Sequence, residues 1–222
     1  MKQKRHQKKS VLVIGMGRFG KHLAMKLQDL GNTVMAVDKD ESVMRELTPR
    51  LENTMIADCT NEAFMQTLGV SGFDMCYVAI GSDLGASILI TSFLKRCGAK
   101  HIVAKASRDI QSDILKAIGA DETVYPEREL AEKIAVRLSS LSIIDCLPLS
   151  ADYSIFEIEV PVEWIGKSLG HLNVRQKYQI NVLTVKNSVV FPAPGADYVF
   201  SEGEQIVVLG TEQNILRICP GT

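Results

Sequence analysis

The sequence predicts an α/β protein: a Rossmann-like, doubly wound parallel sheet followed by a small α+β unit. Three observations lead to this fold class. Short runs of β-branched and aliphatic residues alternate with segments of helical periodicity until about residue 140. Each run is followed by a helix, as the crossover connections between parallel strands require. After Pro148 the pattern changes to alternating strands joined by Pro, Gly, Asn and Asp.

The first part of the chain contains six strands, each followed by a helix. Residues 11–14 are apolar throughout and precede a glycine-rich turn, which is typical of a strand buried on both faces. Glycine residues mark the ends of several helices. The expected strands are residues 11–14, 33–37, 54–57, 75–80, 101–105 and 123–125. The expected helices are residues 19–30, 41–47, 62–68, 84–96, 111–118 and a last one after Pro126, read over 130–141 and continuing into 142–144.

The second part is expected to hold strands at residues 156–160, 180–185 and 205–210. Residues 168–178 are predicted as a short helical segment, and the prolines of residues 191–200 restrict that stretch to a loop or an edge strand. We therefore divide the chain into a basic tail (1–9), a nucleotide-binding domain (10–128), a linking helix (129–149) and a C-terminal domain (150–222).

The composition excludes several classes of protein. With 25 Lys and Arg against 26 Asp and Glu, the net charge is -1, so the broad positive field of a nonspecific nucleic-acid binder is missing and no nucleic-acid partner is expected. No apolar run approaches the roughly 20 residues that cross a bilayer. The five cysteines are scattered without a CxxC pair, which favours neither a disulfide framework nor a zinc site. The basic tail lacks the apolar core of a signal peptide and is either solvated or in contact with an anionic surface.

A GxGxxG motif, Gly15-Met16-Gly17-Arg18-Phe19-Gly20, follows the first strand and opens a helix. Its glycines permit a tight turn, close approach of a pyrophosphate and close packing of helix on strand, while the helix N-terminus offers unpaired N–H groups. Asp38 ends the second strand, where its carboxylate can accept the ribose hydroxyls. Because Asp38 would repel a 2′-phosphate, we expect NAD(H) or an adenine mononucleotide rather than NADP. The alternative is a structural turn with a solvated Asp38.

Further candidates lie beyond the carboxyl ends of the strands, where ligands of such sheets bind. Arg18 either folds onto phosphate oxygens or is solvated. Asp58 either contacts the adenine amino group or caps the next helix. Lys105 either neutralises a phosphate or extends from a buried strand to solvent. The remaining candidates in these turns are Lys39, Cys59, Thr60, Ile80, Gly81 and Ser82.

Glu127 follows the sixth strand and is expected near the phosphates, where a carboxylate needs a compensating charge. That charge is either an Arg of another subunit or a divalent cation, Mg²⁺ or Ca²⁺. The alternative is a glutamate that interacts with the positive end of a helix.

The sequence offers no recognisable reaction centre beside the nucleotide motif. The C-terminal domain contains one histidine, His171, and no HxxE, Cys-His or Ser-Lys arrangement. A nucleotide that acts as a signal is therefore favoured over an enzyme. The first rival is a small NAD-dependent oxidoreductase. The second is a redox-sensing repressor, which would need a DNA-reading element that the sequence does not display.

The motifs VIGMGRFG, AVDKDE, ADCTNE, VAIGSD, LKAIGAD, YPERELAEKIA, LNVRQKY and FPAPGADYVF make the chain resemble the cytosolic regulatory subunits of Ktr/Trk-type bacterial potassium-uptake systems. The resemblance implies an RCK (regulator of potassium conductance) N-terminal domain, a linking helix and an RCK C-terminal domain. It implies no enzyme, but a subunit that gates an integral membrane potassium-translocating partner from the cytoplasmic face, as a homo-oligomeric ring, expected to be an octamer.

The resemblance also implies ligands. ATP, ADP or NAD(H) would bind the N-terminal domain, and the divalent cation is favoured at Glu127. Cyclic di-AMP would bind the C-terminal domain through Asn173, Arg175, Pro192 and Pro194.

Overall fold

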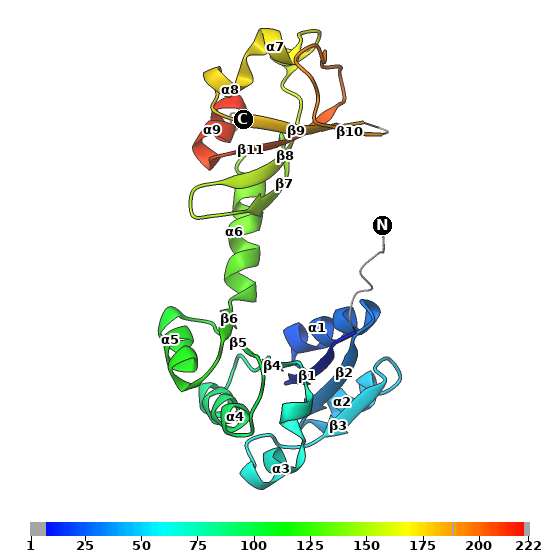
Figure 1. The fold of residues 1–222 in the computed structure, drawn as a ribbon, viewed down its shortest axis with the longest axis vertical. Helices are drawn as coiled ribbons and strands as arrows, with labels where there is room; N and C mark the ends of the chain where they lie inside the picture. Colours follow the sequence, from blue (N-terminus) through cyan, green and yellow to red (C-terminus); the bar gives the residue numbers. More distant parts are fainter. Residues whose placement is uncertain (1–7, 188, 220–222) are drawn as a thin grey trace. The chain divides into compact units, whose positions relative to one another are not determined.

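The computed structural model describes residues 8–187 and 189–219. The chain divides into two compact units, unit 1 (Met1–Arg128) and unit 2 (Glu129–Thr222) (Figure 1). Of the basic tail predicted over residues 1–9, all but Lys8 and Lys9 lies outside the described residues.

Unit 1 is built on a six-stranded sheet with the order β3-β2-β1-β4-β5-β6, in which every pair is parallel. The chain starts at the centre, builds outward through β2 and β3, and then returns to the other side of β1. This reversal creates the switch point at which ligands of such sheets bind. The strands are β1 (Ser10–Ile14), β2 (Thr33–Asp38), β3 (Asn53–Ile56), β4 (Met75–Val78), β5 (Ile102–Lys105) and β6 (Glu122–Val124).

Helices cover both faces of this sheet, which confirms the doubly wound class (Figure 1). Side chains of β1 alternate between two cores: Leu12 and Ile14 enter one, Val11 and Val13 the other. The helices of unit 1 are α1 (Arg18–Asp29) and α2 (Glu41–Leu47) on one face, α3 (Glu62–Thr67), α4 (Leu84–Arg96) and α5 (Asp109–Ile118) on the other, and a 3-10 turn η1 (Val70–Gly72) before β4. Helix α6 (Pro126–Leu138) follows β6 and crosses the boundary between the units.

Unit 2 contains a five-stranded antiparallel sheet with the order β10-β9-β11-β8-β7. Its core holds the single tryptophan, Trp164, together with Phe156 and Phe200. The strands are β7 (Ile143–Pro148), β8 (Ser154–Glu159), β9 (Asn181–Lys186), β10 (Val190–Pro192) and β11 (Gln205–Gly210). The helices are η2 (Val162–Trp164), α7 (Leu169–Leu172), α8 (Val174–Lys177) and α9 (Glu212–Ile218).

The linking helix predicted over residues 129–149 is wrong in its second half. Helix α6 ends at Leu138, and residues Ile143–Pro148 form β7, an edge strand paired with β8. Ile143 and Cys146 are buried in the core of unit 2, which fixes this segment on the sheet. Consecutive β-branched residues, Ile143 and Ile144, favour a strand once such a core is present. The extension of the helix into residues 142–144 is therefore overturned by tertiary packing.

Two other features of unit 2 refine the sequence prediction. The helical segment expected at residues 168–178 is split into α7 and α8 by Asn173, whose φ of 47° lies in the left-handed region. Residues 191–200 are confirmed as an edge strand followed by a loop. Helix α9 was not predicted, although Thr211 caps it by accepting from the N–H of Asn214, a start signal visible in the sequence.

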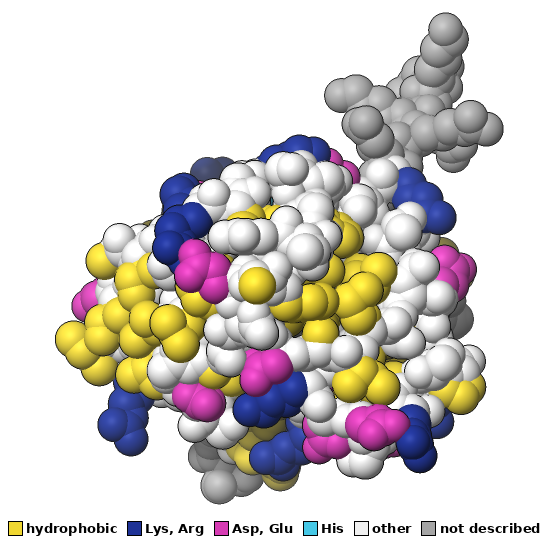
Figure 2. Space-filling view, turned by 90° about the horizontal axis from the view of Figure 1, so that it is seen from below, with side chains coloured by type: hydrophobic (Ala, Val, Ile, Leu, Met, Phe, Trp, Pro, Cys, Tyr) yellow, Lys and Arg dark blue, Asp and Glu magenta, His cyan; other side chains and the backbone are white. Residues whose placement is uncertain are grey.

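No helix in the described ranges is both long and apolar enough to cross a membrane. On the face shown in Figure 2, basic and acidic side chains lie interspersed, with hydrophobic patches between them.

Candidate functional site

A cavity of about 430 Å³ lies at the carboxyl ends of β1, β2, β3 and β4. This is the switch point of the sheet, so the position agrees with the general rule for ligands of such folds. Most of the residues predicted for the nucleotide line it. They are Gly15, Met16, Gly17, Asp38, Lys39, Asp58, Cys59, Thr60, Ile80, Gly81 and Ser82.

The cavity also contains residues that the sequence prediction missed. Asp40 and Asp83 each follow the turn after a strand and cap the next helix, α2 and α4 respectively. That position, between the end of a strand and the start of a helix, was the signal that could have identified them. The other missed residues supply mainly apolar walls: Ile14, Val43, Ala57, Ala79, Ala86 and Ile90.

The glycines of the loop have different roles. Gly15 has a φ of 96°, and a Cβ on Gly20 would lie only 1.9 Å from the carbonyl oxygen of Gly15, so the turn and the helix packing require both. Gly17 has an ordinary φ of -64° and nothing within 4 Å of where its Cβ would be. The folded chain therefore does not need glycine at residue 17. The open space there is available to a ligand atom.

Helix α1 begins without a side-chain cap and without an acidic residue in its first turn. By contrast, α2, α3 and α4 are capped by Asp40, Asn61 and Asp83. The first N–H groups of α1 and the positive end of its dipole thus remain available to an anion. A phosphate is the anion expected at such a glycine loop.

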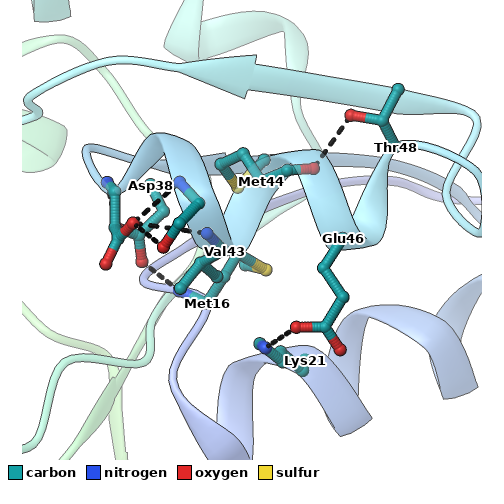
Figure 3. A network of polar contacts seen from close by, with 9 residues as sticks. Met16, Lys21, Asp38, Val43, Met44, Glu46 and Thr48 are labelled. Atoms are coloured by element: carbon teal, nitrogen blue, oxygen red, sulfur yellow. Dashed lines mark hydrogen bonds and ion pairs between the residues drawn. The ribbon is translucent and has the colours of Figure 1, made fainter.

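Asp38 connects the end of β2 to the glycine loop (Figure 3). Its Oδ2 accepts a hydrogen bond from the Met16 N–H at 2.5 Å, and its Oδ1 accepts one from the Asp40 N–H at 2.9 Å. Nearby, Lys21 of α1 and Glu46 of α2 form an ion pair at 2.9 Å, which joins the helices on either side of the loop. The carboxylate predicted for the ribose therefore also holds the loop in place.

The cavity walls are more acidic than basic. Asp38, Asp40, Asp58 and Asp83 line it, against Lys39. Asp58 accepts from both the N–H and the hydroxyl of Thr60, and these hydrogen bonds lower its pKa. Of the two alternatives for Asp58, capping of the next helix is wrong, because Asn61 caps α3. Such walls suit the uncharged sugar and base of a nucleotide better than its phosphates.

Cys59 lies in this wall and is 3% exposed. Burial, with a smaller effect of the Asp58 and Asp38 charges, raises the pKa of its thiol to about 12. The thiol is therefore protonated near neutral pH and is a packing group, not a nucleophile.

Five predicted residues, Arg18, Phe19, Gly20, Lys105 and Glu127, do not line the cavity. Three of them meet beside it: Lys105 donates to Glu127 at 2.5 Å, and its ammonium lies 5.8 Å from the centre of the Phe19 ring. A Cβ on Gly81, in the cavity wall, would be 3.1 Å from the same ammonium. The hydrogen bond from Lys105, helped by the charge of Arg18, lowers the pKa of Glu127.

Glu127, the residue predicted to hold a divalent cation, has a different partner in this chain, the ammonium of Lys105. The side chain of Lys105 is 11% exposed and that of Glu127 is 69% exposed, so a largely covered ammonium is neutralised by a carboxylate at the surface. The described part of the chain contains no group of three or more His, Cys, Asp or Glu side chains placed to hold a metal. A cation at Glu127 would therefore need further ligands from a bound nucleotide, from water or from another subunit.

A groove of about 260 Å³ lies in unit 2, between α7, α8, the start of β9 and residue Ala196. Of the predicted second-messenger residues, Asn173 and Arg175 line it. Pro192 ends β10 and Pro194 lies in the following loop, and neither lines the groove.

Comparison with known proteins gives matches along most of the chain. The TrkA-N domain matches residues 11–126 and the TrkA-C domain residues 154–220. Ktr system potassium uptake protein C of Bacillus subtilis is 37% identical over 95% of this chain and 96% of its own length. Ktr system potassium uptake protein A of the same organism is 33% identical over 96% of each chain.

Among solved structures, the GsuK channel bound to NAD matches with a TM-score of 0.65 and 15% identity. The match covers 97% of this chain but only 40% of that one. This likeness supports the fold of both units in their order along the chain.

Proposed function

The chain belongs to the family of TrkA-N and TrkA-C domain proteins, and from this membership we propose that it is a nucleotide-responsive regulatory subunit of a potassium-uptake system. Its ligands act as signals, and it is not an enzyme. The observation that carries the proposal is the cavity of unit 1, in which the open space at Gly17 and the uncapped start of α1 face the same switch point as Asp38.

The ligand of this cavity is an adenine nucleotide: ATP, ADP or NAD(H). Asp38 has lone pairs left for the ribose hydroxyls after accepting its two backbone N–H groups. The polar turn at Asp58 and Thr60 suits the adenine side. The phosphates lie against Gly17 and α1, and a longer phosphate tail reaches toward Arg18 and Lys105. The acidic cavity walls and the cationic residues beside them support this division.

The partner is an integral membrane potassium-translocating subunit, contacted from the cytoplasmic face by a homo-oligomeric ring, expected to be an octamer. Nucleotides gate it only if they bind two ring conformations with different affinities. Unit 1 contains one ion pair that could respond to the bound nucleotide. In it, Lys105 holds Glu127, which lies in the first turn of α6. A phosphate or a divalent cation, Mg²⁺ or Ca²⁺, that competes for either partner changes the charge at the start of that helix.

We propose that the groove of unit 2 binds cyclic di-AMP. The guanidinium of Arg175 can pair with a phosphate and the amide of Asn173 with a base edge. The groove is open and smaller than the pockets of about 300 to 1,000 Å³ that enclose drug-sized ligands. One chain would therefore cover part of the ligand, with a second copy covering the rest.

The regulatory proposal is tested by co-purifying the full chain with a candidate membrane subunit and measuring potassium flux with reconstituted vesicles. ATP and ADP should give different fluxes when the chain is present and equal fluxes when it is omitted. Flux that does not depend on the chain would refute the proposal. Turnover of NAD(H) with a small substrate would favour the oxidoreductase instead.

A further inference from the structure

A buried carboxylate in unit 2 ties together three segments of the chain. Glu204, just before β11, is 6% exposed. It accepts hydrogen bonds from the Tyr198 hydroxyl at 2.7 Å and the Ser201 N–H at 2.9 Å, with a longer one of 3.4 Å from the Asn187 amide. Burying a carboxylate is costly unless hydrogen-bond donors satisfy it. These hydrogen bonds therefore fix the Glu204 side chain, and Glu204 in turn fixes the segments that carry the donors.

Tyr198 transmits this anchoring to the groove. Its backbone carbonyl accepts from the Leu169 N–H at 2.8 Å, and the carbonyl of Ala196 accepts from the Gly170 N–H at 2.7 Å. A Cβ on Gly170 would lie 2.9 Å from the Ala196 carbonyl oxygen, so helix α7 and the loop approach as closely as glycine allows. Leu169, Gly170 and Ala196 all line the groove. The wall of the groove is thus joined directly to the residue that Glu204 holds.

Aromatic packing supports the same loop. The Tyr198 ring lies 5.4 Å from that of Phe191 and 5.6 Å from that of Phe200. The Phe200 ring lies in turn 5.7 Å from the ring of Trp164. Burial and the hydrogen bond to Glu204 raise the pKa of Tyr198 to about 12, which keeps its hydroxyl a donor over the whole physiological range.

We propose that Glu204 and Tyr198 are positioning residues of the unit 2 groove: they hold the loop containing Ala196 against α7, so that the groove is formed before its ligand arrives. The inference rests on the proposal that this groove binds cyclic di-AMP. Neither residue lines the groove. Their contribution to affinity is the ordering of the loop, which the ligand would otherwise have to bring about.

The test uses the full chain and the variant Tyr198→Phe, which removes the hydroxyl and keeps the ring. Hydrogen exchange at the Leu169 and Gly170 amides should become about tenfold faster, because their acceptors lie on the released loop. Exchange in β8 and β11 should not change. Cyclic di-AMP should bind about five- to tenfold more weakly, while ADP binding in unit 1 stays as in the wild type. Glu204→Gln, which replaces one acceptor oxygen with a donor, should act in the same direction.

The matched control is Tyr153→Phe, the same chemical change at a half-exposed tyrosine in the β7–β8 turn. It should leave both measurements unchanged, and Trp164 fluorescence reports that unit 2 is folded in every variant. Unaltered exchange at Leu169 and Gly170, or equal acceleration throughout unit 2, would overturn the positioning role. Equal cyclic di-AMP affinity in wild type and Tyr198→Phe would also overturn it. A wild type without any cyclic di-AMP binding would instead refute the proposed ligand, and the exchange data would still decide whether the loop is held as inferred.

Discussion

The N–H of Met16 donates to Oδ2 of Asp38 at 2.5 Å, so the carboxylate at the end of β2 holds the glycine loop that follows β1. Ribose recognition and loop geometry therefore depend on one side chain. The hydrogen bond thus joins the GxGxxG loop to the aspartate at the end of the second strand before any ligand is bound.

Asp38→Ala should weaken adenine-nucleotide binding by about 1.5 to 3 kcal/mol, because charge-assisted hydrogen bonds to the ribose are lost and the loop loses its anchor. Titration calorimetry with ADP measures the change. Asp113→Ala, at an exposed aspartate of α5, is the control and should bind ADP normally. Unchanged affinity in Asp38→Ala would remove the ribose assignment.

Gly17→Ala separates binding from folding. The backbone angle and the open space at residue 17 accept a methyl group, so the free energy of unfolding should change by less than about 1 kcal/mol. Nucleotide affinity should nevertheless fall by about tenfold or more, because the methyl group occupies the space proposed for phosphate. Gly72→Ala, at another open glycine, is the control. Normal ADP affinity in Gly17→Ala would place the phosphates elsewhere.

Glu127→Gln tests the proposed cation. If Mg²⁺ or Ca²⁺ bridges Glu127 to the phosphates, either ion should increase ATP affinity in the wild type, and the variant should lose most of that increase. ADP binding should remain nearly intact. Fluorescence titrations with and without the ion measure both effects. An identical response to the ion in wild type and variant would leave Glu127 only as the partner of Lys105.

Because β7 belongs to the sheet of unit 2, a stable fragment of this unit has to include it. A fragment of residues 129–222 keeps β7 on the sheet and should unfold cooperatively in urea. A fragment of residues 150–222 lacks the buried Ile143 and Cys146 and should be less stable by about 3 to 5 kcal/mol or more. Trp164 fluorescence follows both transitions. Equal midpoints would mean that β7 contributes nothing to the unit.

Alkaline pH should destabilise unit 1 through its buried thiols. Burial raises the pKa of Cys76 to about 12 from the ordinary value of 9.0. Between these values the unfolded chain releases the proton while the folded chain keeps it, so the free energy of unfolding falls as pH rises from 9 to 12. Cys76→Ala should make this fall shallower by up to about 1.4 kcal/mol per pH unit. If the free energy of unfolding fell equally with pH in wild type and variant, the raised pKa of Cys76 would be contradicted.

Local signals in the sequence determined much of unit 1. The GxGxxG motif, the strand before it and the aspartate ending the next strand each have a short-range physical cause, and the cavity forms where they predict. The strand-helix alternation sufficed for the parallel sheet, because parallel pairing requires crossover helices.

Only the tertiary structure decided contacts between residues that are distant in the chain. Ile143 became a strand residue because the core of unit 2 buries it, although the periodicity before it is helical. Lys105 pairs with Glu127 because the end of β5 and the start of α6 both lie at the carboxyl ends of the strands. The hydrogen bond between Tyr198 and Glu204 depends on the course of a loop. Such pairings depend on packing and burial between distant segments, which local propensity does not encode.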